Sequence, residues 1–404
     1  MRSVVAIGTL DTKGAEYAYL RDRLQEHGVD VILVDAGVLG EPTTPADVSR
    51  AEVAQAAGAD VSDLAKAGDR GAAVETMSRG AAAVVERLYG EGRLDAVVGM
   101  GGTGGTSLIT HAMQQLPVGV PKLMVSTVAS GDTRPYVGAV DIAMMYSVVD
   151  VAGVNQISAR IIGNAAAAIA GMAQAKIPPQ EGGRTLIGAS MFGVTTPCVT
   201  TARERLEELG YEILVFHQTG TGGQSMEELV KAGFVRGVLD VTTTELADEL
   251  VGGVLAAHPK RAEVAGALGV PQVVSLGALD MVNFGPMDTV PEAFRGRNLY
   301  VHNPSVTLMR TTPEECAELG KRLARKLSKA AGPTALFVPL RGVSMIATEG
   351  QPFYDAAADA ALFSAVRDNL GSNVELHELD TDVNDPAFAL AMADRLHEML
   401  KAAS

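Results

Sequence analysis

Short runs of Val, Ile and Leu alternate along the chain with longer segments in which apolar residues recur every three to four positions. In the first half these runs predict strands at Ser3–Thr9, Asp30–Val34, Asp95–Gly99 and Lys122–Thr127. The periodic segments predict helices near Ala15–His27, Arg70–Tyr89, Ser107–Gln115 and Asn155–Gln174. Strands that alternate with helices in this way indicate an α/β fold with a mostly parallel sheet.

The pattern stops at Ile177–Gly183, where prolines and glycines interrupt every periodicity. This segment predicts a linker between an N-terminal domain, 1–178, and a C-terminal domain, 184–404. The second half then restarts like the first, because Ile7-Gly8 and Ile187-Gly188 are each followed by a helix containing Arg-x-Arg-Leu and by another strand. We therefore expect a duplication: two Rossmann-like, doubly wound domains with mostly parallel sheets and a cleft between them. Further strands are predicted at Arg184–Ala189, Tyr211–Phe216, Arg236–Val241, Gln272–Leu276, Asn298–Val301, Thr334–Pro339 and Val374–Leu379.

A glycine-rich loop, Gly99–Ser107, directly follows one predicted strand and precedes a predicted helix. Glycine lets a ligand approach the main chain, and a helix N-terminus adds partial positive charge, so the loop predicts a phosphate site. Its candidate ligands are Gly101, Gly102, Thr103, Gly104, Gly105 and Thr106.

Three alternatives compete with a general phosphate site. The spacing G-x-G-x-x-G is present, but no acidic residue follows about 20 positions later, as NAD binding would require. A Walker A loop would end in Gly-Lys-Ser/Thr, whereas this loop ends in Gly105-Thr106-Ser107. The glycines could also serve only a tight, closely packed turn.

Polar residues follow the other predicted strands at the edge where α/β proteins bind ligands. Lys13 could contact phosphate, Asp35 could accept a ribose hydroxyl, and Asp11 and Asp132 are candidate Mg²⁺ ligands. The alternative roles are helix capping and turn formation. The remaining candidates in this group are Thr9, Thr12, Gly14, Ser126 and Ser130.

The second half carries its own polar residues near strand ends. Asp280, His302, Arg310 and His217 would supply an acid, a base and an anion clamp if they converged in one cleft. Cys198 near a helix N-terminus could be a nucleophile or a small buried residue. A second glycine loop, 217–225, could bind an anion or only turn the chain.

Composition narrows the classes of partner. The net charge of -15 and the lack of a basic run outside 321–326 argue against nucleic acid, and that run is typical of a solvated helix face. The two cysteines are far apart in sequence, and we find neither a signal peptide nor an apolar run of membrane-spanning length, so we expect a cytoplasmic protein without membrane contact. We also expect a homodimer or larger homo-oligomer, with the alanine-rich segment 155–174 as its interface.

Several motifs together resemble one family. The segments Ala6–Gly14, Val31–Gly37, Gly99–Ser107, Ser126–Asp132 and Gly342–Gly350 are similar to those of the uncharacterised UPF0261 family. The resemblance covers essentially the whole chain. It implies two Rossmann-like domains and ATP binding in the first, at Thr9–Gly14, Asp35 and Gly101–Thr106. Plant members include a virus-resistance protein with an added TIM-barrel-like domain, so we expect a stand-alone version here.

From these observations we expect an ATP-binding, magnesium-dependent protein. It would be an enzyme that acts on a small anionic metabolite in the interdomain cleft, by phosphoryl or adenylyl transfer. The alternative is a binding or regulatory protein that is gated by the nucleotide and does not turn it over.

Overall fold

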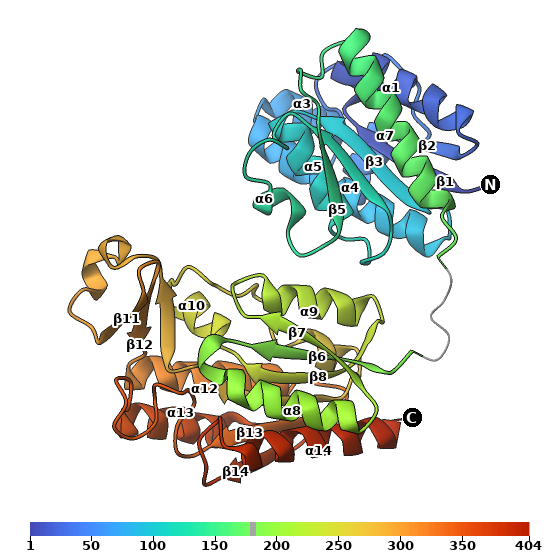
Figure 1. The fold of residues 1–404 in the computed structure, drawn as a ribbon. Coiled ribbons are helices and arrows are strands. Elements are labelled where there is room, and N and C mark those ends of the chain that lie inside the picture. Colours follow the sequence, from blue (N-terminus) through green and yellow to red (C-terminus); the bar gives the residue numbers. More distant parts are fainter. Residues whose placement is uncertain (178–182, 404) are drawn as a thin grey trace. The chain divides into compact units, whose positions relative to one another are not determined.

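The computed structural model describes residues 1–177 and 183–403, so most of the predicted linker lies outside the described residues. The chain divides into two compact units, within 1–179 and 180–404 (Figure 1). Both contain a parallel sheet with helices on its two faces, which confirms the predicted fold class.

The first unit has a five-stranded parallel sheet in the order β2-β1-β3-β4-β5. Its strands are β1 Ser3–Gly8, β2 Asp30–Asp35, β3 Ala96–Gly101, β4 Lys122–Ser126 and β5 Ile142–Tyr146. Leu24 and Ile162 belong to the core that α1 and α7 form on one face, whereas Met77 and Ile109 belong to the core under α2, α4 and α5 on the other. The helices are α1 Leu10–Glu26, α2 Arg50–Ala56, α3 Val61–Ala67, α4 Arg70–Gly90, α5 Thr103–Met113, α6 Arg134–Val137 and α7 Gln156–Gln174.

Strand order reverses between β1 and β3, and Tyr17 of α1 lies at that point. The two strands pair as far as Ile7 and Gly99. Beyond this pair the buried Tyr17 hydroxyl accepts the N–H of Met100 at 2.7 Å and also contacts the carbonyl oxygens of Met100 and Ile7. Burial raises the pKa of Tyr17, so the hydroxyl stays protonated and can donate. The side chain therefore satisfies backbone groups that would otherwise be orphaned where the strands part.

The second unit repeats this strand order and extends it. Its parallel sheet has the order β14-β13-β9-β8-β6-β7, so β7-β6-β8-β9 corresponds to β2-β1-β3-β4 of the first unit. The shared order agrees with the predicted duplication. The strands are β6 Leu186–Met191, β7 Glu212–His217, β8 Val235–Thr242, β9 Gln272–Gly277, β13 Thr334–Pro339 and β14 Glu375–Leu379. The longer helices are α8 Thr196–Glu208, α9 Gly222–Lys231, α10 Glu245–Val251, α12 Pro313–Leu327, α13 Ala356–Asn369 and α14 Pro386–Ala403; the short α11 is Val264–Ala267.

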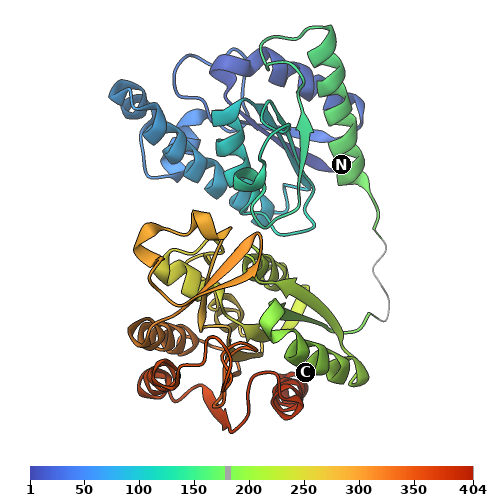
Figure 2. The ribbon, with the colours of Figure 1, turned by 60° about the vertical axis from the view of Figure 1, so that its left-hand side comes forward.

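A small antiparallel sheet was not predicted. It has the order β10-β12-β11, and the predicted strand at 298–301 belongs to it rather than to the parallel sheet (Figure 2, orange). Its strands are β10 Met281–Phe284, β11 Leu299–Asn303 and β12 Val306–Arg310. Met281, Leu308 and Met309 of this sheet belong to the main hydrophobic core of the second unit, so the sheet is an extension of that core.

Two predicted helices begin earlier than expected. Helix α1 begins at Leu10 rather than near Ala15, and α5 begins at Thr103 rather than at Ser107. The glycines of the first loop are therefore not only a connection but also the first turn of α5. Because glycine has a low helix propensity, the sequence pattern did not predict a helix for this turn.

Removing the Tyr17 hydroxyl tests its role at the strand reversal. In Tyr17→Phe the Met100 N–H would be buried without an acceptor, which costs about 1 to 3 kcal/mol of unfolding free energy. Chemical denaturation of the wild type and the variant measures this difference. Tyr89→Phe, on the exposed end of α4, is the control and should be neutral. Equal stability of Tyr17→Phe and wild type would contradict the role assigned to the hydroxyl.

Candidate functional site

A cavity of about 440 Å³ opens at the carboxyl ends of β1, β2 and β3 in the first unit. This is the strand-reversal position at which doubly wound sheets bind ligands. The cavity is bounded by the starts of α1 and α5, the loop after β2, helix α4 and Asp150. Eight predicted residues line it: Thr9, Asp11, Thr12, Lys13, Gly102, Thr103, Gly104 and Gly105.

The first turn of α5 presents free backbone donors to this cavity. The N–H groups of Thr103, Gly104 and Gly105 have no hydrogen-bond partner within 1–177 and 183–403, and Gly102 provides no side-chain cap. The next N–H, that of Thr106, is bonded to the Gly102 carbonyl at 2.8 Å. Three unpaired donors at the positive end of a helix form an arrangement that suits an anion.

Packing explains only part of the glycine content of this loop. A Cβ on Gly99 would lie 2.5 Å from Ile109, and one on Gly101 would lie 3.1 Å from the Gly105 Cα. By contrast, a Cβ on Gly102, Gly104 or Gly105 would meet no atom closer than 3.7 Å. None of these glycines has a positive φ. The last three are therefore required neither by packing nor by backbone conformation, and a Cβ at each of them would make only ordinary van der Waals contacts.

Arg70 is a cavity residue that the sequence analysis missed. It is exposed at the first position of α4, and a Cβ on Gly104 would lie 4.0 Å from its guanidinium nitrogen. Arg70 makes no ion pair or hydrogen bond with the residues that the structure describes. A cation at a helix N-terminus opposes the helix dipole, and this local conflict is the signal that could have drawn attention to Arg70.

Another part of the cavity lining is apolar. It is formed by the loop after β2 and by the inner faces of α4 and α5, through Val38, Leu39, Ala73, Val74, Met77 and Leu108. The cavity thus combines backbone donors and charged side chains of both signs with apolar side chains, and small-molecule sites commonly combine polar and apolar lining.

Asp11 connects the loop after β2 to α1. Its Oδ2 accepts the N–H groups of Val38, Leu39 and Gly40 at 2.8 to 3.2 Å. Its Oδ1 is buried and has no hydrogen-bond partner. Lys13 donates to the Val151 carbonyl at 2.5 Å. Asp11 therefore holds the loop after β2 in place, and its second carboxylate oxygen is left buried without a partner.

The other predicted nucleotide and metal ligands lie outside the cavity lining. Buried Asp35 accepts the N–H groups of Leu10 and Gly37, and its pKa is raised by burial. Buried Thr106 and Ser126 bond to each other at 2.6 Å. Asp132 is exposed, and the Arg134 guanidinium lowers its pKa to about 2. Two further candidates, Gly14 and Ser130, are respectively packed against Thr43 and exposed.

The four candidate catalytic residues of the second unit do not converge. Asp280 is buried and accepts the Ser344 hydroxyl, and burial raises its pKa to about 6 despite the nearby Arg310. Arg310 bonds to Asp359 at 2.6 Å, so it is not a free anion clamp. His302 is exposed on β11, whereas His217 is exposed at the end of β7 beside Phe192. Among these four, only Asp280 and Arg310 lie close together.

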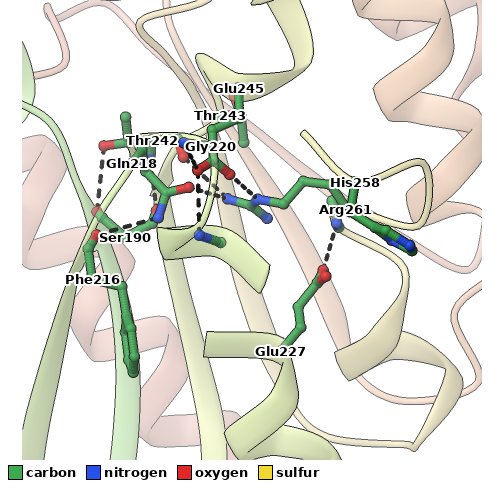
Figure 3. A network of polar contacts seen from close by, with 12 residues as sticks. Ser190, Phe216, Gln218, Gly220, Glu227, Thr242, Thr243, Glu245, His258 and Arg261 are labelled. Atoms are coloured by element: carbon green, nitrogen blue, oxygen red, sulfur yellow. Dashed lines mark hydrogen bonds and ion pairs between the residues drawn. The ribbon is translucent and has the colours of Figure 1, made fainter. Parts of the chain in front are cut away.

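The second glycine loop has a structural role. A Cβ on Gly222 would lie 1.9 Å from the His217 carbonyl oxygen, and one on Gly223 would lie 2.2 Å from Arg261 Nε. Arg261 is fully buried and forms ion pairs with Asp240 and Glu245, as Figure 3 shows in part. Glu245 also accepts the Gly220 N–H at 2.9 Å. The loop therefore folds around a buried arginine rather than around a ligand.

Cys198 and the basic run 321–326 also have structural roles. Burial raises the pKa of the Cys198 thiol to about 12, so it is a small core residue rather than a nucleophile. Lys321, Arg322 and Lys326 pair with glutamates on α10, on α12 and before α11. Within the described residues, no three His, Cys, Asp or Glu side chains are grouped as a metal site, and no helix is long and apolar enough to span a bilayer.

Comparison with known proteins places this architecture in one family. The N-terminal domain model of the uncharacterised protein family UPF0261 matches residues 2–178, and its C-terminal domain model matches residues 184–400. The chain belongs to the UPF0261 family. A UPF0261 protein of Clostridium tetani is 51% identical over 99% of both chains. The tomato (Solanum lycopersicum) protein named ToMV resistance protein Tm-1(GCR237) is 39% identical over 98% of this chain and 55% of its own length.

Solved structures offer a more distant likeness. A UDP-N-acetylglucosamine 2-epimerase from Rickettsia bellii has 12% identity and a TM-score of 0.23, covering 64% of this chain and 78% of the other. The UPF0261 assignment therefore rests on the two family domains and on the near full-length bacterial relative.

The two glycine loops are expected to respond oppositely to alanine. Gly223→Ala should lower the unfolding free energy by about 1 to 3 kcal/mol, because its Cβ overlaps the buried Arg261–Glu245 pair. Gly105→Ala should leave stability unchanged or raise it by up to about 1 kcal/mol, because it adds a helix-favouring residue without overlap. Thermal and denaturant unfolding measure both. Equal destabilisation by the two changes would contradict the distinction between the loops.

A pH effect is expected from Glu227, which accepts the Ala262 N–H beside Arg261. Burial raises the pKa of Glu227 to about 7. Because the folded protein then binds this proton more tightly than the unfolded chain, the associated stability is present below about pH 4.5 and is lost as the pH rises through 7. Glu227→Gln should therefore gain stability relative to wild type between pH 5 and pH 8, by on the order of 2 kcal/mol. Parallel pH–stability curves would contradict the raised pKa.

Proposed function

We propose that this protein binds ATP in the cavity of its first unit, with the phosphates at the N-terminus of α5. The observation that carries the proposal is the space beside Gly102, Gly104 and Gly105, which neither packing nor backbone conformation explains. Three unpaired N–H groups point to an anion, and backbone donors at a helix N-terminus commonly bind phosphate.

The surroundings of the loop support a nucleotide rather than inorganic phosphate. Arg70 and Lys13 bring positive charge to the cavity, while Val74, Met77 and Leu108 supply an apolar wall against which a base can lie. The volume of about 440 Å³ falls within the range of small-molecule sites. NAD remains less favoured, because Asp35 is engaged with backbone N–H groups and does not line the cavity.

Magnesium fits this site through one protein ligand. Mg²⁺ at nucleotide sites is held by one or two carboxylates together with phosphate oxygens. Of the two carboxylates that line the cavity, Asp11 and Asp150, Asp11 has an Oδ1 that is buried without a hydrogen-bond partner, and a metal ion would satisfy it. Asp132 does not fit this role, because it is paired with Arg134 outside the cavity.

We take an ATP-dependent enzyme to be the leading function and nucleotide-gated binding to be the second candidate. One observation favours the second: Asp11 touches both the cavity and the loop of residues 38–40, so a bound ligand could bias that loop toward one conformation. The tomato relative, named as a virus-resistance protein, fits a binding role. Measured turnover of ATP separates the two functions.

Calorimetric titration with ATP, with and without Mg²⁺, tests the site. Gly104→Val should weaken ATP binding at least about tenfold, or about 1.4 kcal/mol, because its side chain enters the phosphate region. Gly163→Val is the matched control, since a Cβ there meets nothing within 4 Å and Gly163 lies on α7 outside the cavity lining. NAD should bind more weakly than ATP.

A second variant guards against misfolding of Gly104→Val. Arg70→Gln leaves the backbone of the glycine loop unchanged and removes the unpaired positive charge. It should therefore weaken the binding of ATP more than the binding of adenosine. Undiminished ATP affinity in both variants, or no ATP binding by wild type, would rule out the proposed site.

A further inference from the structure

A second hollow lies beside the cavity at the carboxyl ends of β4 and β5. Its volume is about 300 Å³, and it is lined by Thr127 and by the segment from Tyr146 to Asp150. Asp150 lines the cavity as well as the hollow. The two spaces also adjoin through the glycine loop, since a Cβ on Gly102 would lie 3.7 Å from the Thr127 hydroxyl oxygen.

A strained turn sets the position of Asp150. Val148 has a φ of 62°, and the Val149 N–H bonds to the Ser147 carbonyl at 2.6 Å across it. A β-branched residue rarely adopts this conformation, which persists only where the surroundings impose it. Here the Ser147 N–H is bonded to the Ser126 carbonyl, and Lys13 holds the Val151 carbonyl. The segment is thus tied to β4 on one side of Asp150 and to α1 on the other.

The carboxylate of Asp150 is only partly engaged. Its Oδ1 accepts the Val151 N–H at 2.8 Å, and its Oδ2 has no partner among the residues that the structure describes. The side-chain hydroxyls of Thr127 and Tyr146 likewise make no hydrogen bond in that part of the chain. The hollow therefore offers one carboxylate and two hydroxyl groups, a set that can orient an alcohol or water and accept its proton.

We propose that this hollow binds the hydroxyl-bearing acceptor of a phosphoryl transfer, with Asp150 as the general base; this inference rests on the proposed ATP site. The acceptor oxygen forms a bond to the γ-phosphorus of ATP, and the bond from that phosphorus to the β–γ bridging oxygen breaks. The electron pair of the broken bond leaves with ADP, and the acceptor proton passes to Asp150 Oδ2. Arg70, Lys13 and the α5 amides stabilise the charge on the phosphates.

Water, the smallest hydroxyl nucleophile, is the probe for the test. The wild type should hydrolyse ATP slowly, and Asp150→Asn should lower that rate by about 100-fold or more, because general-base catalysis contributes at least this much. The calorimetric Kd for ATP should change less than about threefold, because the amide keeps the size of the side chain. Asp30→Asn, an exposed residue at the amino end of β2 and therefore at the opposite edge of the sheet, should behave like wild type.

A binding measurement provides a readout independent of turnover. ADP with aluminium fluoride mimics the phosphoryl group in transfer together with its nucleophile. Asp150→Asn should therefore weaken the binding of this complex at least about tenfold, whereas the affinity for ADP without aluminium fluoride should not change. ATP binding without hydrolysis, or equal hydrolysis by Asp150→Asn and wild type, would overturn the acceptor site and leave the nucleotide site standing. If the wild type does not bind ATP, both the nucleotide site and the acceptor site that rests on it are ruled out.

Discussion

The arrangement of the first unit depends on how backbone groups are satisfied where β1 and β3 part. Between the two strands, the buried hydroxyl of Tyr17 serves the Met100 N–H and the carbonyl oxygens beside it. A few residues later, in the first turn of α5, no side chain does the same for Thr103, Gly104 and Gly105. Backbone polar groups are thus satisfied by a side chain at the first position. At the next position backbone donors are left without a partner, and the cavity lies there.

The two units share a topology but use the corresponding region differently. Each places a glycine-containing loop and a helix start at the carboxyl edge of its parallel sheet. In the second unit this region is closed by Arg261, whose guanidinium pairs with Asp240 and with Glu245 (Figure 3). A buried ion pair is tolerated only when all its polar groups are satisfied. The glycines there leave the space that the arginine side chain needs. In the first unit the corresponding space is an open cavity lined by charged side chains of both signs.

The cavity and the adjoining hollow both open at the carboxyl edge of one sheet and share Asp150. The apolar wall on α4 and α5 lies on one face of the sheet, whereas Asp150 leads into α7 on the other face. The glycine loop lies between them. The apolar wall, the open backbone donors at the start of α5 and the hollow therefore follow one another along this edge, and Asp150 lies where the cavity and the hollow meet.

Hydrophobic periodicity by itself determined the α/β class, both parallel sheets and most of their strands, because buried strands and amphipathic helices leave regular patterns. The glycine loop and the start of α1 also identified eight of the 17 residues that line the cavity. Tertiary structure decided the rest. Asp35, Ser126 and Arg310 could not be distinguished from ligands by their types, because only packing shows that their polar atoms are already engaged. Arg70 and Asp150 lie far from the glycine loop in sequence, and only the fold brings them to the cavity.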